Sequence, residues 1–227
     1  MARSIAFQAK LCYSLNMIIS YHGLGCIKAQ LGDKVIAFNP ISKEASQKYN
    51  RFGSDIAMIS LNHPDYNGVE NVWHGDKAPF IVDGPGEYEV GGVYIKGVPT
   101  EGDGGVVNTV YSVLFDDINL CHLGALSVSN LKPEVVESLG EIDILFVPIG
   151  GGAVLEAEEA YKLSTSLEPK IIVPLHNGKL NGKGSPINIF LEEEGEEGLK
   201  PLDKLTIKKK DLTDKEAEIV LLAYESS

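Results

Sequence analysis

The feature that most constrains the fold of this chain is a series of short apolar segments, separated by turn residues. Segments of this length suit β-strands, whereas a membrane span needs about 20 consecutive apolar residues. In the first half the segments follow one another closely, and Gly32-Asp33 between two of them is typical of a tight hairpin. In the second half they alternate with amphipathic helical segments. This rhythm predicts an α/β (α+β) domain in which helices cover β-sheets.

Periodicity assigns the individual elements. Ala157, Ala160, Leu163 and Leu167 share one face of a helix. The predicted helices are Pro133–Leu139, Glu156–Leu167 and Ile187–Glu194. The predicted strands are Met17–Tyr21, Cys26–Leu31, Val35–Phe38, Asp55–Leu61, Phe80–Val82, Glu87–Val90, Val93–Lys96, Thr109–Phe115, Leu120–Leu123, Ile142–Pro148, Lys170–Leu175 and Glu218–Tyr224.

Composition and charge argue against several functional classes. The chain has 227 residues, enough for one core, and a formal net charge of −12. An acidic surface repels phosphate backbones, so we expect no nucleic-acid partner, and the short basic run Lys208–Lys210 is read as a solvated face. No membrane association is expected. Cys12, Cys26 and Cys121 form no CxxC pair, which favours reduced thiols and a cytoplasmic location.

Two glycine-rich stretches invite a phosphate-loop reading. Gly150-Gly151-Gly152 follows a predicted strand but lacks the G-x-G-x-x-G spacing. The stretch from Gly178 to Gly182-Lys183 is one residue short of a Walker A loop and has Gly184 where Ser or Thr would bind magnesium. A tight strand-to-helix turn is the preferred interpretation of the first stretch.

Two polar motifs follow predicted buried strands directly. Asn62-His63-Pro64-Asp65-Tyr66 comes after Asp55–Leu61, and His176-Asn177 comes after Lys170–Leu175. Side chains at strand ends are held rigidly and face a cleft, as metal ligation requires. At these residues the chain resembles the metallo-β-lactamase superfamily, in particular the small zinc-dependent hydrolases related to ascorbate-6-phosphate lactonase. Further likeness lies in Gly84–Val90, Cys121–Gly124 and Val147–Gly152.

The resemblance implies a four-layer αββα sandwich with its site at one edge of two packed sheets. It covers residues 17–227 as one domain and leaves Met1–Asn16 as a leader or N-terminal extension. It also implies a metal signature, of which three ligand positions remain: His63, Asp65 and His176. Four ligand positions have lost their residue type and are occupied by Leu61, Tyr66, Gly102 and Ala125, while Asn39 replaces a supporting aspartate.

A hydrolytic zinc site usually needs three protein ligands and an open coordination position. The retained residues leave neither half of a two-metal centre with three ligands, and a phenol such as Tyr66 is a poor substitute for imidazole. Asn39 and Ala125 both remove negative charge that a cation would balance. We therefore expect no bound cofactor and no two-metal catalysis. A rebuilt site using Glu101, Asp103 or His122 is an alternative, although His122 is better read as a buried structural residue.

Two functional hypotheses remain. The first is a non-catalytic protein that binds a protein or small-molecule ligand at the vestigial site. The second is a phosphodiesterase- or lactonase-type hydrolase that uses one zinc or manganese ion, with Asp65 as its catalytic residue. The sequence leaves the substrate, the ligand and homo-oligomerisation open.

The reading of Met1–Asn16 as a leader generates a prediction. The first recognisable strand begins at Met17, so deleting Met1–Asn16 should leave the fold intact. Chemical denaturation of the full and shortened chains should give the same free energy of unfolding. A loss of several kcal/mol, large against a typical total of about 5–15 kcal/mol, would contradict this expectation.

Overall fold

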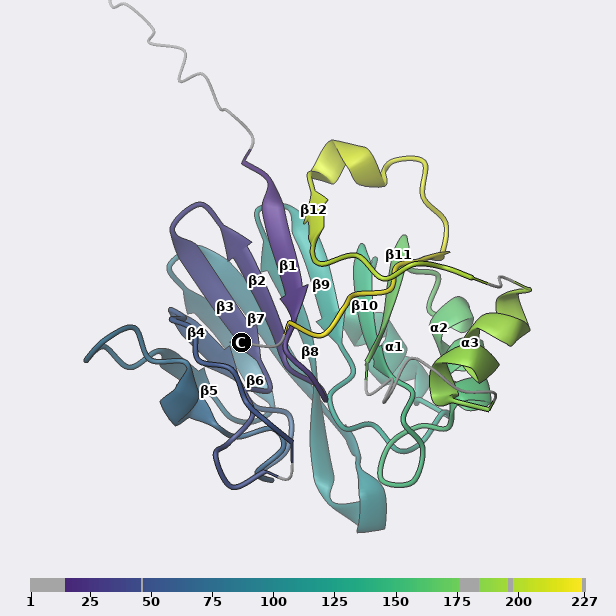
Figure 1. The fold of residues 1–227 in the computed structure, drawn as a ribbon, viewed down its shortest axis with the longest axis horizontal. Coiled ribbons are helices and arrows are strands. Elements are labelled where there is room, and N and C mark those ends of the chain that lie inside the picture. The colour runs from purple at the N-terminus through teal and green to yellow at the C-terminus, as the bar shows by residue number, and fades with distance from the viewer. Residues whose placement is uncertain (1–14, 46, 176–183, 196–197, 226–227) are drawn as a thin grey trace, which may run out of the picture.

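The computed structural model describes residues 15–45, 47–175, 184–195 and 198–225. Two β-sheets pack face to face, and α-helices lie against the outer side of the second sheet (Figure 1). The sandwich predicted from the sequence is confirmed. The outer face of the first sheet is covered, among the described residues, by loops and the short 3-10 turn Val69–Asn71 rather than by an α-helix.

The first sheet has six strands in the order β12-β1-β2-β3-β4-β5. Antiparallel pairing joins β1, β2 and β3, whereas β4 and β5 add in parallel. The predicted Gly32-Asp33 turn is confirmed, since Leu31 pairs with Lys34 and Gly32 has a φ of +58°. The strands are β1 Met17–Tyr21, β2 Ile27–Leu31, β3 Lys34–Phe38, β4 Ile56–Met58, β5 Phe80–Val82 and β12 Leu205–Ile207.

The second sheet has seven strands in the order β13-β11-β10-β9-β8-β7-β6. The hairpins β6–β7 and β7–β8 and the pair β8–β9 are antiparallel, and β9, β10, β11 and β13 run parallel. The strands are β6 Gly86–Val90, β7 Val93–Glu101, β8 Val107–Phe115, β9 Ile118–His122, β10 Ile144–Pro148, β11 Ile171–Leu175 and β13 Glu218–Ile219.

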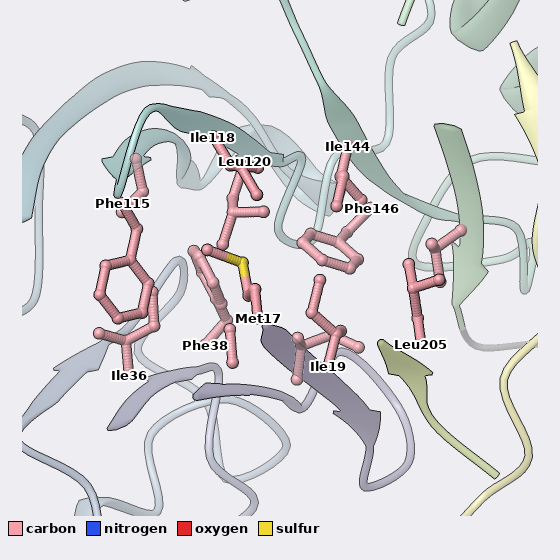
Figure 2. Packing of buried hydrophobic residues seen from close by; sticks show 14 of the residues in the cluster. Met17, Ile19, Ile36, Phe38, Phe115, Ile118, Leu120, Ile144, Phe146 and Leu205 are labelled. Carbon is pink, nitrogen blue, oxygen red and sulfur yellow. The ribbon is translucent and has the colours of Figure 1, made fainter. Parts of the chain in front are cut away.

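Alternating side chains of both sheets fill the space between them. Met17, Ile19 and Phe38 of the first sheet face Leu120 and Phe146 of the second, and all five are buried (Figure 2). A second apolar cluster lies between the second sheet and the helices α1 Pro133–Leu139, α2 Ala157–Ser166 and α3 Pro186–Glu194. No helix in the described ranges is long and apolar enough to cross a membrane.

The strands of the structure differ from the predicted ones in several places, and the differences in the first sheet and at the C-terminal end are the largest. The short strand β12 was not predicted, although it pairs with β1 and completes the first sheet. The predicted strand Asp55–Leu61 is limited to β4, and its last residues already belong to a loop. The predicted strand Glu218–Tyr224 is limited to β13, followed by isolated bridges at Leu222 and Tyr224. The residues of both shortened runs are largely buried, so their apolar pattern reports burial rather than strand pairing.

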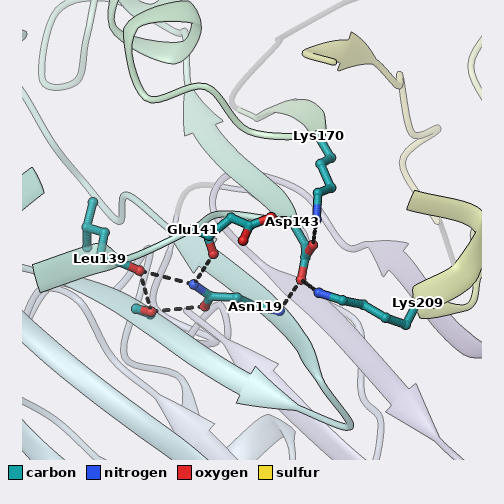
Figure 3. Close-up of polar contacts among 7 residues, drawn as sticks. Asn119, Leu139, Glu141, Asp143, Lys170 and Lys209 are labelled. Carbon is teal, nitrogen blue, oxygen red and sulfur yellow. Dashed lines mark hydrogen bonds and ion pairs between the residues drawn. The ribbon is translucent and has the colours of Figure 1, made fainter. Parts of the chain in front are cut away.

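A buried carboxylate joins three segments at the amino-terminal end of β10. The Asp143 side chain is 2% exposed and accepts hydrogen bonds from Lys170 Nζ at 2.8 Å, Lys209 Nζ at 2.6 Å and the Asn119 N–H at 2.8 Å (Figure 3). Burial alone would raise the pKa of Asp143, but these hydrogen bonds outweigh it and hold that pKa below its ordinary value. The charged form of Asp143 therefore stabilises the fold.

The Asp143 cluster predicts a stability loss on neutralisation. Asp143→Asn should lower the free energy of unfolding by roughly 3 kcal/mol at neutral pH, because it removes a buried carboxylate from two lysines and leaves Lys170 only its contact with exposed Glu141. Since the folded-state pKa is the lower one, this contribution is present above the unfolded-state pKa and disappears as the pH falls through the folded-state pKa.

Denaturant unfolding at neutral and strongly acidic pH measures both effects. Asp117→Asn is the matched control, because Asp117 is exposed in a turn with a φ of +63°, which asparagine tolerates. It should change stability by no more than about 0.5 kcal/mol. An equal loss for the two variants would contradict the role assigned to Asp143.

Candidate functional site

Four described segments meet at the edge of the sandwich where β4 and β9 end. We call this edge, formed by residues 60–67, 101–107, 124–127 and 150–156, the candidate site. The Thr109 N–H donates to the Ser60 carbonyl at 2.8 Å, and the Leu155 N–H donates to the Leu126 carbonyl at 3.0 Å. The motif that follows β4 therefore lies beside the second sheet, at the edge that the superfamily resemblance implies.

His63 and Asp65 lie side by side within one turn. His63 Nδ1 is 3.7 Å from Asp65 Oδ2 and also accepts the Asp65 N–H at 3.3 Å. The side chains are 55% and 26% exposed, respectively, so this local pair is open to solvent. His176 lies outside the described residues, and its convergence with His63 and Asp65 stays a prediction.

Apolar packing occupies three of the four positions that differ from the superfamily's ligand pattern. Tyr66 and Ala125 are buried against Val154, and Leu61 packs against this cluster. Burial, and secondarily the charge of Asp65, raises the pKa of the Tyr66 phenol, so it stays protonated. A neutral phenol, a methyl group and an isobutyl group offer a cation no anionic or imidazole ligand.

Gly102 brings the fourth position next to Ala125. It begins the turn between β7 and β8, where its N–H donates to the Val106 carbonyl at 2.8 Å. A Cβ at Gly102 would lie 3.5 Å from the Ala125 carbonyl oxygen. The structure thus places these two positions together.

The alternative of a rebuilt metal site finds no support in the described part of the chain. Glu101 and Asp103 are exposed on the turn that contains Gly102. No group of three or more His, Cys, Asp or Glu side chains that could hold a metal gathers among the residues described. The donors that the described residues bring to the candidate site do not fit the two-metal centre that the superfamily resemblance implies.

His122 is a structural residue, as predicted. It is fully buried, and its ring stacks on Phe38 with 5.1 Å between centroids. The Gly124 N–H donates to Nδ1 at 2.9 Å, so the ring proton is on Nε2, which donates to the Gly25 carbonyl at 2.9 Å. Its two nitrogens therefore join the end of β9 to the turn after β1.

Two asparagine amides hold the backbone of the candidate site. Asn39 is buried with a φ of +45°, and its Oδ1 accepts the Ser60 N–H at 2.8 Å. The Asn108 Oδ1 accepts the Ala125 N–H at 2.7 Å, while its Nδ2 donates to the Leu123 carbonyl at 2.9 Å. Sequence reasoning had not identified Asn108, since its only signal was one polar residue at the start of an apolar strand.

The Gly150-Gly151-Gly152 stretch forms a tight turn closed by its own chain. The Gly152 N–H donates to Glu156 Oε1 at 3.0 Å, and Gly151 and Gly152 both have positive φ. A Cβ at Gly151 would lie 2.5 Å from Glu156 Oε2. The Glu156 carboxylate thus accepts a backbone N–H of the glycine stretch, which supports the turn interpretation. The stretch from Gly178 to Lys183 lies outside the described residues.

Known proteins are similar to this chain in sequence. A UPF0173 metal-dependent hydrolase of Listeria monocytogenes is 25% identical over 195 residues, which cover 70% of this chain and 85% of that protein. A UPF0173 metal-dependent hydrolase of Natranaerobius thermophilus is 25% identical over 189 residues, covering 70% and 83% of the two chains.

A solved structure extends the likeness over nearly the whole chain. It is a Thermotoga maritima protein assigned as a zinc-dependent hydrolase of the metallo-β-lactamase superfamily. The two chains are 29% identical with a TM-score of 0.72, over 91% of this chain and 98% of the other. Residues 18–176 match the family described as the beta-lactamase superfamily domain. The chain therefore belongs to the beta-lactamase superfamily.

Proposed function

We propose that this chain is a non-catalytic member of the superfamily, which binds a protein or small-molecule partner. The observation that carries this proposal is the apolar packing of Tyr66, Ala125 and Leu61 at positions where the family pattern has ligands. Packing of this kind stabilises the edge without a cation and supplies no group that could ionise a bound water.

The hydrogen bonds at the candidate site support the same reading. Asn39 and Asn108 hold the backbone through neutral amides, and His122 is committed to two backbone contacts. A superfamily member that relied on metal for this order would lose it in the absence of the cation, because metal binding and folding share free energy.

A second candidate is a hydrolase that uses a single metal ion. The comparisons favour it, because the similar proteins carry names of metal-dependent or zinc-dependent hydrolases. His63, Asp65 and His176 would be its ligands. The local pairing of His63 with Asp65, 3.7 Å apart, is compatible with such a role.

Metal content separates the two candidates. Protein purified from cells grown with added zinc and manganese should contain far less than one metal ion per chain by elemental analysis. The matched control is His63→Ala, Asp65→Ala, which should show the same trace content. Near-stoichiometric metal in the natural chain, lost in the control, would establish the hydrolase reading instead.

Thermal stability provides an independent prediction. The melting temperature of the natural chain should respond neither to chelator nor to zinc. The triple variant Leu61→His, Tyr66→His, Ala125→Asp should lose about 3 kcal/mol or more in chelator, because it puts polar groups into a packed apolar cluster. Zinc should restore part of that loss.

The control variant Leu61→Asn, Tyr66→Asn, Ala125→Asn introduces polar groups that are poor zinc ligands. It should be destabilised in chelator and gain nothing from zinc, which separates metal binding from a general salt effect. If the natural chain itself gains several degrees with micromolar zinc, the non-catalytic proposal is wrong.

A further inference from the structure

The strand β5 ends the first sheet with one side unpaired. The Phe80 N–H donates to the Asp55 carbonyl and the Val82 carbonyl accepts the Ile59 N–H, both at 2.8 Å. Because peptide groups alternate in direction along a strand, those of Ile81 point away from β4. The free side of β5 therefore offers the N–H and the C=O of Ile81, together with the Pro79 C=O and the Asp83 N–H.

This free side is apolar and accessible. Phe80 is 47% exposed and Ile81 is 43% exposed. The five residues from Ala78 to Val82 carry no charge, whereas Lys77 precedes them and Asp83 follows them. An uncharged, exposed edge of this kind is a template for pairing with another strand.

The other sheet edges in the described part of the chain are protected. Exposed Glu87 and Glu89 lie on β6, and lysines 204 and 208 flank β12. The last edge, β13, is only two residues long. Charges and short length are the usual devices against edge-to-edge association. β5 is also short, with three residues, but among the described edge strands it is the one that exposes two large apolar side chains, Phe80 and Ile81.

We propose that β5 pairs antiparallel with β5 of a second copy of this chain, across a twofold axis at Ile81. This inference is independent of the proposed function. In that register each Ile81 donates its N–H to the Ile81 carbonyl of the other copy. Each Asp83 N–H donates to the Pro79 carbonyl of the other copy. The arrangement uses the donors and acceptors of the free side, and the missing N–H of Pro79 leaves no donor unpaired.

The charged residues on either side of β5 favour a second copy of this chain as its pairing partner. With Ile81 opposite Ile81 and the pairing continued beyond Phe80–Val82 as far as residue 77, Lys77 of one copy would lie diagonal to Asp83 of the other, within reach of a long side chain. The twofold axis generates this pair twice. Lys77 Nζ is 3.6 Å from Asp55 in the single chain, but its side chain is 77% exposed, so it can turn toward a partner. A pattern complementary to itself is the signature of an isologous interface.

Sedimentation velocity of the full chain tests the proposal. The natural protein should form a concentration-dependent dimer. Ile81→Lys places like charges opposite each other and should raise the dimer dissociation constant roughly tenfold or more. The matched control Tyr94→Lys changes a comparably exposed residue on the other sheet and should leave the dimer unchanged. Far-UV circular dichroism checks that both variants fold.

Cross-linking gives a second readout that does not depend on the lysine variant. Directly opposite hydrogen-bonded residues have Cα atoms about 5.5 Å apart, within disulfide range. Ile81→Cys in a Cys12→Ser background should therefore form a covalent dimer on mild oxidation, whereas Tyr94→Cys in the same background should not. A natural chain that stays monomeric at its highest soluble concentration overturns the proposal. So does a dimer that Ile81→Lys leaves intact, or equal cross-linking of the two cysteine variants.

Discussion

The rest of the candidate site depends on two side-chain amides, which hold the backbone of its loops in place through hydrogen bonds. Asn39 accepts a hydrogen bond from the Ser60 N–H, and Asn108 accepts one from the Ala125 N–H. The loops after β4 and β9 are therefore held by one residue directly after β3 and one residue of β8. Both amides are buried and neutral, which avoids the desolvation cost of a buried carboxylate. Tyr66 and Ala125 then pack against Val154 on this frame. Order here comes from neutral hydrogen bonds and apolar contacts.

Much of the fold could be predicted from apolar periodicity because most elements are both buried and long enough to show it. The bounds of β1, β5 and α1 agree with the predicted segments. The strand β12 escaped prediction, since three residues between lysines show no usable period. At the other extreme, the run from Glu218 to Tyr224 is apolar because it is buried, although only its first two residues pair as a strand.

The sequence predicts a contact at the candidate site where both residues belong to the same short motif. His63 and Asp65 are two residues apart in one turn, so their contact follows from local sequence. The resemblance to the superfamily also singled out Tyr66 and Ala125, which the structure brings together. Asn108 and Val154 could not be found in this way. Their roles depend on segments that meet only in the folded sandwich, and neither residue type signals a site by itself.

The pairing of β1 with β12 sets an order of events during synthesis. The first strand leaves the ribosome early and can pair at once with β2, but its other neighbour is encoded nearly 190 residues later. Contacts this distant in sequence form slowly, because a long loop must close first. Until residues 205–207 emerge, the nascent sheet presents an open backbone edge at β1. A ribosome-bound chain halted before that point therefore exposes a strand edge that the finished protein covers.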